Sequence, residues 1–100
     1  MQSRDVDQLL GLALRARKLV TGEAIIKSIQ KGDAYLVLIA EDASENTKKR
    51  YLDKCSYYDV PVKIYSDSIN MSYAIGKANR MALAITDQGF ARSILKKLGG

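Results

Sequence analysis

The stretch "YLVLIAEDASENTKKRYLDKCSYYD" (residues 35–59) contains the two patterns that decide the fold. Its first six residues (35–40) are continuously apolar. Such a run is typical of a central strand that is covered on both faces, as in α/β proteins. The run is also far shorter than the roughly 20 residues that a membrane helix needs, so we expect no membrane partner.

A helix is predicted directly after this strand, over residues 41–59. Asp42 and, three residues later, Glu45 have the spacing of a capping box, with the aspartate in the capping role. The residues at helical spacing on its expected apolar face are Leu52, Cys55 and Tyr58.

Helices and strands continue to alternate on both sides of this pair. Toward the N-terminus, apolar spacing predicts helices over 4–18 and 23–31, with a short strand over 19–21 between them. The residues expected to cap or end these helices are Ser3 or Asp5 for the first and Gly32-Asp33 for the second. Toward the C-terminus the expected elements are a strand over 60–65 that starts near Pro61, a helix over 66–77 ended by Gly76, a strand over 81–86, and a helix over 87–98 capped by Asp87.

This alternation predicts how the elements are layered. Strands that alternate with helices form βαβ units, in which helices cover both faces of a parallel sheet. We therefore predict an α/β fold, a three-layer α/β/α sandwich around a mixed, mostly parallel sheet of about four strands. One hundred residues without a linker suit a single domain over residues 1–100.

The composition argues against catalysis. The chain has no histidine and one cysteine, Cys55, which is too few ligands for a zinc, haem or iron–sulfur site and leaves a catalytic triad hard to build. We expect a binding protein without metal or cofactor. An unpaired cysteine and a start without a signal sequence favour the cytoplasm.

The net charge of +5 is concentrated at the two ends of the chain. Residues 1–32 hold six Lys/Arg against three Asp/Glu, and residues 66–100 hold five against two, whereas residues 33–65 hold five against six. If the ends meet in the fold, they form one basic face, as in nucleic-acid binders. A basic excess that only aids solubility is the alternative.

The stretch "KLVTGEAIIKSIQKG" (18–32) is the first candidate site. A helix that starts behind Gly22 presents free backbone N–H groups, which attract anions. Glu23, Lys27 and Lys31 share one face of this helix, either as a surface glutamate–lysine pair or as a polyanion site. Just before it, "RARK" (15–18) suits either a helix C-terminus or contacts to a nucleic-acid backbone.

Two further groups of residues could also contact nucleic acid. The "KKR" run (48–50) more often forms a solvated helix face. The six tyrosines could stack on bases, although their spacing predicts that most are in the core or half-buried.

Taken together, the chain resembles the L-seven-Ae family, a small ribosomal-type RNA-binding fold that recognises kink-turns, and within it the bacterial YlxQ-type members. The stretches that carry the resemblance are "LLGLALRARKLVTGE", "KGDAYLVLIAEDASENTKK", "YYDVPV" and "AIGKANRMALAITDQGF". They span nearly the whole chain in the family's order.

The resemblance implies which residues meet RNA. In the family, a Gly-x-Asn-Glu-x-x-Lys pattern contacts the sheared G·A pairs of the kink-turn. Gly22, Glu23 and Lys27 match it here, without the asparagine and with a turn one residue shorter, and Lys31 matches a following basic position. A second loop that packs on a flipped-out base corresponds to Arg80-Met81-Ala82.

We therefore expect a monomeric RNA-binding protein, ribosomal or translation-related, that recognises a kink-turn or a similar bend. Its expected contact residues are Arg17, Lys18, Thr21, Gly22, Glu23, Lys27, Lys31, Arg80, Met81 and Ala82. One alternative is a protein-interaction adapter that keeps the fold with a weakened RNA site. A small enzyme or nucleotide-binding domain is a further alternative, which the missing histidine and glycine fingerprint disfavour.

Overall fold

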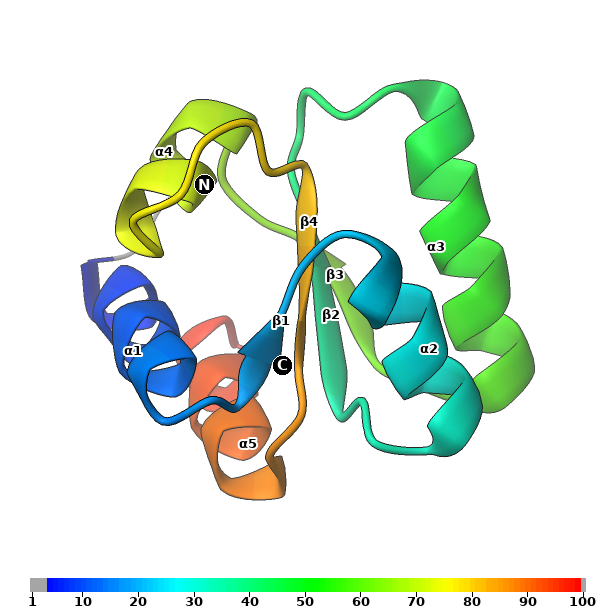
Figure 1. The fold of residues 1–100 in the computed structure, drawn as a ribbon, viewed down its shortest axis with the longest axis horizontal. Coiled ribbons are helices and arrows are strands. Elements are labelled where there is room, and N and C mark those ends of the chain that lie inside the picture. Colours follow the sequence, from blue (N-terminus) through cyan, green and yellow to red (C-terminus); the bar gives the residue numbers. More distant parts are fainter. Residues whose placement is uncertain (1–3, 100) are drawn as a thin grey trace.

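The computed structural model describes residues 4–99 and confirms the alternating order of elements. Five helices and four strands follow one another as α1 (Arg4–Arg15), β1 (Leu19–Val20), α2 (Glu23–Lys31), β2 (Leu36–Ile39), α3 (Glu45–Tyr58), β3 (Val62–Ile64), α4 (Ser68–Ala74), β4 (Ala82–Ile85) and α5 (Gln88–Lys97). Helices α1, α4 and α5 cover one face of the sheet, and α2 and α3 cover the other (Figure 1). The three-layer α/β/α sandwich is confirmed.

The sheet is mixed, and its strand directions differ from the prediction. The strand order is β1-β4-β2-β3, and within residues 4–99 β2 and β3 are the only neighbouring strands that pair in parallel. Strand β4 lies between β1 and β2 and is antiparallel to both, so a mostly parallel sheet was wrong. The reason is that α4 stays at the end of the sheet where β3 finishes, so β4 starts from that same end (Figure 1).

The two central strands divide the core between the two helical layers. In β2, Leu36 and Leu38 pack with α1, α4 and α5, whereas Val37 and Ile39 pack with α2 and α3. All four side chains are fully buried, which explains why the strand is apolar at every position rather than at every second one. Burying each such side chain stabilises the fold by about 1.5–3 kcal/mol.

Several predicted helix ends are confirmed. Gly32 ends α2 in the left-handed conformation, with a φ of 80°. The Asp87 carboxylate caps α5 and accepts a hydrogen bond from the Phe90 N–H at 2.9 Å. Ser3, one of the two caps considered for α1, lies outside the described residues, and Asp5 lies within the first turn of that helix.

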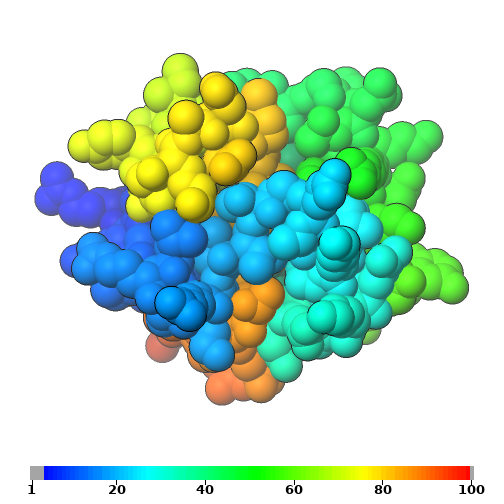
Figure 2. Space-filling model, viewed as in Figure 1, coloured from blue at the N-terminus to red at the C-terminus, as the bar shows by residue number. Residues whose placement is uncertain are grey.

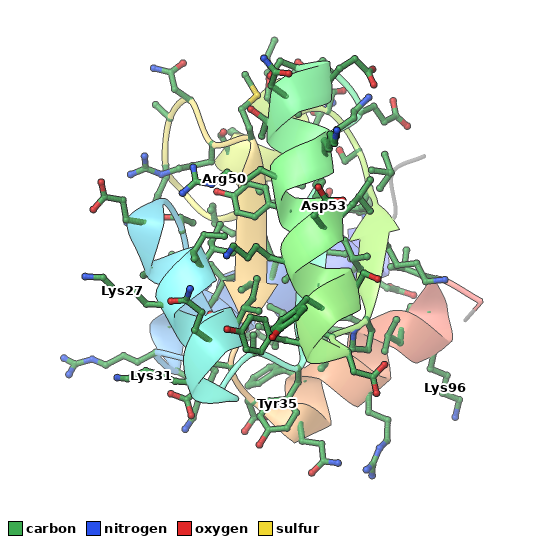
Figure 3. The ribbon with its side chains drawn as sticks, turned by 90° about the vertical axis from the view of Figure 1, so that its right-hand side faces the viewer. Lys27, Lys31, Tyr35, Arg50, Asp53 and Lys96 are labelled. Atoms are coloured by element: carbon green, nitrogen blue, oxygen red, sulfur yellow. The ribbon has the colours of Figure 1, made fainter. Side chains whose placement is uncertain are left out.

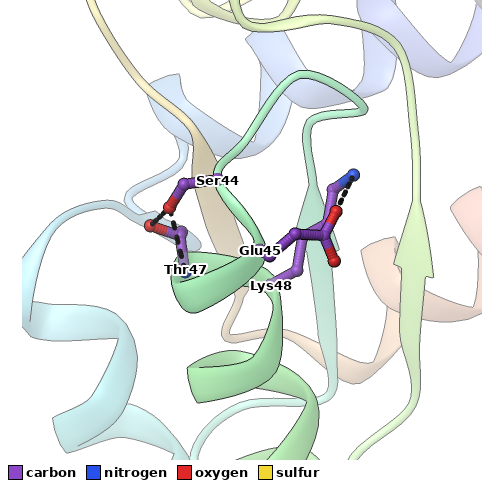
Figure 4. A network of polar contacts seen from close by, with 4 residues as sticks. All are labelled: Ser44, Glu45, Thr47 and Lys48. Atoms are coloured by element: carbon purple, nitrogen blue, oxygen red, sulfur yellow. Dashed lines mark hydrogen bonds and ion pairs between the residues drawn. The ribbon is translucent and has the colours of Figure 1, made fainter.

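The cap of α3 is Ser44, not Asp42 (Figure 4). The Ser44 hydroxyl oxygen accepts from the Thr47 N–H at 3.1 Å. Asp42 instead accepts from the backbone N–H and the hydroxyl of Ser68, at 2.8 and 2.6 Å, and so ties the start of α3 to α4. Both serine and aspartate can cap a helix, and the sequence offers them two residues apart.

The buried face of α3 also differs from the predicted one. Tyr51 and Cys55 are buried, whereas Leu52 and Tyr58 are exposed. Of the six tyrosines, Tyr51 and Tyr65 are buried and the other four are exposed, so the prediction that most are in the core or half-buried was wrong. No helix within residues 4–99 is long and apolar enough to span a membrane.

Candidate nucleic-acid interface

The turn between β1 and α2 has a conformation that favours glycine. Gly22 is the residue before α2, with φ 65° and ψ −141°, and no side chain caps the helix. The first N–H groups of a helix have no partner within the helix and give its N-terminus a partial positive charge. A Cβ atom placed on Gly22 would meet nothing within 4 Å, so this surface of the turn is open.

Helix α2 presents the predicted charged face. Glu23, Lys27 and Lys31 are all exposed, and the two lysines extend outward on the same side of the helix (Figure 3). Within residues 4–99 neither lysine forms an ion pair, so the surface glutamate–lysine pair is not formed. A hollow of about 470 Å³ lies beside this face and is lined by Val20, Ala24, Lys27, Ser28, Lys31, Asp33, Tyr35 and Thr86.

The connection from α1 to β1 holds Arg17 and Lys18 at the surface. Arg17 has a φ of 60°, a left-handed conformation that is uncommon for residues other than glycine. The Lys18 N–H donates to the Ala13 carbonyl, and the Lys18 carbonyl accepts from the Thr86 N–H, both at 2.8 Å. These bonds fix the connection, and thereby its two cations, against β4.

The loop between α4 and β4 is held by a buried serine. The Ser72 hydroxyl accepts from the Arg80 N–H at 2.8 Å and donates to the Arg80 carbonyl at 3.3 Å. Arg80 is half-buried, and its Nε atom has no hydrogen-bond partner among the described residues. Met81 is 41% exposed, whereas Ala82 is only 5% exposed and packs in the core beneath the loop.

The two loops lie side by side, although they are far apart in the sequence. Figure 2 shows the surface of the β1–α2 connection directly beside that of the α4–β4 connection. The fold thus brings the β1–α2 connection, with Thr21, Gly22 and Glu23, beside the α4–β4 loop, which holds Arg80 and Met81. Arg17 and Lys18 precede β1, at the end of the sheet where β4 finishes, and Lys31 ends α2, so these three cations lie away from the two loops. Thr21 is half-buried. The α4–β4 loop also holds an exposed cation, Lys77, which was not among the predicted contact residues.

The "KKR" run contributes one further cation near α2, which is Arg50. It is exposed on α3, on the side that faces α2 (Figure 3), and its guanidinium carbon lies 5.9 Å from the centroid of the Tyr51 ring. We assigned this run to a solvated helix face, and the exposure of Arg50 agrees with that assignment. Lys48 of that run fits the assignment, because it pairs with Glu45 at 3.9 Å.

The chemical inventory of the described residues favours binding through hydrogen bonds and charge. Within residues 4–99 no group of histidine, cysteine and carboxylate side chains is placed to hold a metal ion. Burial raises the pKa of the Cys55 thiol to about 11, so this group is protonated at neutral pH. The interface offers backbone N–H groups, cations and a single glutamate.

Comparisons with known proteins identify the family of this chain and several relatives. The sequence pattern of the ribosomal protein L7Ae/L30e/S12e/Gadd45 family matches residues 4–95. The chain is 50% identical over 91 residues to the RNA-binding protein YlxQ of Bacillus subtilis, covering 90% of this chain and 91% of that protein. It is 44% identical over 93 residues to YlxQ of Enterococcus faecium, covering 92% and 89%.

A solved structure has the same fold. It is a protein of unknown function from Bacillus halodurans, 39% identical, with a TM-score of 0.93 over 98% of this chain and 100% of that one. Both YlxQ relatives are named as RNA-binding proteins rather than as enzymes. The chain belongs to the ribosomal protein L7Ae/L30e/S12e/Gadd45 family, and within it resembles the YlxQ proteins.

Proposed function

We propose that this chain is a non-enzymatic RNA-binding protein that recognises a kink-turn or a similarly bent RNA. The observation that carries the proposal is the open helix N-terminus at Gly22, which adjoins the α4–β4 loop (Figure 2) and is followed on α2 by the exposed Lys27 and Lys31. The names of its YlxQ relatives support an RNA partner. The family description supports a ribosomal or translation-related RNA, and the protein would bind it as a monomer.

Each part of the interface has a chemical role in this proposal. Gly22 lets the RNA approach the backbone closely, and the Glu23 carboxylate accepts hydrogen bonds from guanine amino groups. Phosphates are held by the exposed cations Arg17, Lys18, Lys27 and Lys31.

The second loop would pack against an extruded base. Met81 offers the apolar contact, and the half-buried Arg80 beside it would donate from its guanidinium to an acceptor on the RNA. Ala82 would support this loop from the core rather than contact the base itself.

Titration calorimetry tests the proposal directly. We expect tight binding to a kink-turn RNA and weak binding to the same RNA with its tandem G·A pairs replaced. The double variant Glu23→Ala, Lys27→Ala should lose this discrimination. A matched control is Glu45→Ala, Lys49→Ala, an exposed pair with the same spacing on α3. Equal binding to both RNAs would leave only generic electrostatic affinity.

The salt dependence of binding gives a second, independent readout. Each neutralised phosphate lowers the slope of log affinity against log salt by about 0.7–0.9, so four cations should give a slope of about −3. An affinity that stays flat between low and moderate salt contradicts the proposal.

A protein-interaction adapter is the second candidate. The observation in its favour is the exposed apolar surface of α4, where Ile69 is 79% and Tyr73 86% exposed. If the protein acts as an adapter, the charge reversals Lys27→Glu and Lys31→Glu leave its cellular function intact. Loss of function with a folded protein would decide for RNA.

A further inference from the structure

A second and larger cleft lies beyond the proposed kink-turn surface. It has a volume of about 890 Å³ and is lined by the C-terminal ends of α2 and α3 and by residues of α5, which covers the other face of the sheet. Its floor is apolar and includes Ile29, Val60 and Leu95. A cleft of this size is large enough for a small ligand or part of a polymer.

Aromatic rings and cations line the walls of this cleft. Tyr35 is 41% and Tyr58 39% exposed, so both rings keep a surface that is free to stack. Three cations line it, Lys31, Arg92 and Lys96, against the single acid Asp59. Tyrosines set among cations are the combination that binds unpaired nucleotides, because bases stack on the rings and phosphates meet the cations.

The cleft continues the surface of α2. Lys31 and Tyr35 line both this cleft and the smaller hollow beside Lys27. In Figure 3 Lys27, Lys31, Tyr35 and Lys96 follow one another along the side and around the lower end of the molecule. An RNA strand that leaves the turn at Gly22 along α2 is thereby led toward the cleft.

We propose that this cleft binds unpaired nucleotides that flank the bent element in the same RNA. A base stacks on Tyr35 or Tyr58, and the adjoining phosphates are held by Lys31, Arg92 and Lys96. The inference rests on the proposed RNA-binding function and extends it. The charge of the cleft and its continuity with α2 favour RNA over an apolar protein segment.

The test compares three RNAs in calorimetric titrations of the full chain: a blunt kink-turn RNA and the same RNA with a short uridine tail at either end. We expect one tail to tighten binding of the wild-type protein about tenfold, in the range measured for one stacked base. The variant Tyr35→Ala, Arg92→Gln should lose this gain and keep its affinity for the blunt RNA. The matched control is Leu52→Ala, Lys63→Gln, because Leu52 is 41% exposed, as Tyr35 is, Lys63 is exposed, and both lie outside the cleft.

The outcomes separate the cleft from the kink-turn site. If neither tail tightens wild-type binding while the blunt RNA still binds, the cleft proposal is overturned and the proposed function stands. If the blunt RNA does not bind at all, the proposed function fails first. If the cleft variant and its control lose the tail's gain in affinity equally, the cleft proposal is also overturned, because the gain then reflects only generic charge. Photo-crosslinking of a 4-thiouridine tail to the peptide that holds Tyr35 or Tyr58 would support it.

Discussion

Replacing Gly22 by asparagine should damage the protein more than the same change at Gly32, at the other end of α2. A Cβ atom at either glycine would meet nothing within 4 Å, so the two substitutions differ only in backbone conformation. Gly32 has φ 80° and ψ 15°, the left-handed region that asparagine tolerates. Gly22 has φ 65° and ψ −141°, which side chains other than glycine rarely adopt.

The strain at Gly22 sets the expected magnitude. We expect Gly22→Asn to lower the free energy of unfolding by about 1–3 kcal/mol and Gly32→Asn by under about 1 kcal/mol. Each kcal/mol lowers Tm by about 4–8 °C in a domain of this size. Urea unfolding measures both values, and calorimetry with a blunt kink-turn RNA should show lost binding for Gly22→Asn alone. Equal stability losses, or kink-turn binding retained by Gly22→Asn, would refute the reasoning.

Three further predictions address the second loop, acid stability and the left-handed arginine. Ser72→Ala removes both bonds to Arg80 and should cost about 1–3 kcal/mol in urea unfolding and weaken RNA binding by the folded protein. The side-chain and backbone hydrogen bonds from Ser68 lower the pKa of Asp42 below 3.8. That stability is present at neutral pH and lost as pH falls through the folded pKa, so Tm should fall more steeply in acid for wild type than for Asp42→Asn. Arg17→Gly should stabilise the fold by up to about 1 kcal/mol yet reduce the salt slope of RNA binding by about 0.7–0.9, and a stability loss would contradict it.

Local signals in the sequence were enough for most of the fold. The apolar run at 35–40 predicted β2, Gly32 predicted the end of α2, and Asp87 predicted the start of α5. Each of these features depends on residues close together in the chain. The direction of β4 depends instead on the end of the sheet at which α4 lies, because β4 starts from that end. Apolar spacing in the sequence does not encode this position.

The candidate site was predicted in part, for a related reason. Motif matching located Gly22, Lys27 and Arg80, and the two charged chain ends indicated that they could meet. Lys77 was not predicted, because no motif in the sequence marks this exposed cation of the α4–β4 loop. The cleft beside Tyr35 was missed as well, since it is built from segments that share no sequence pattern.

The antiparallel direction of β4 has a mechanical consequence for the two loops. Because β1 runs up as β4 runs down, the chain leaves β1 at the same end of the sheet where it enters β4, with Val20 opposite Ala84. The spacing of the loops is therefore set by the backbone ladder, about 4.8 Å between neighbouring strands, rather than by any side chain at the surface. Substitutions at the surface of the two loops therefore change which groups face the RNA but leave the distance between the loops unchanged.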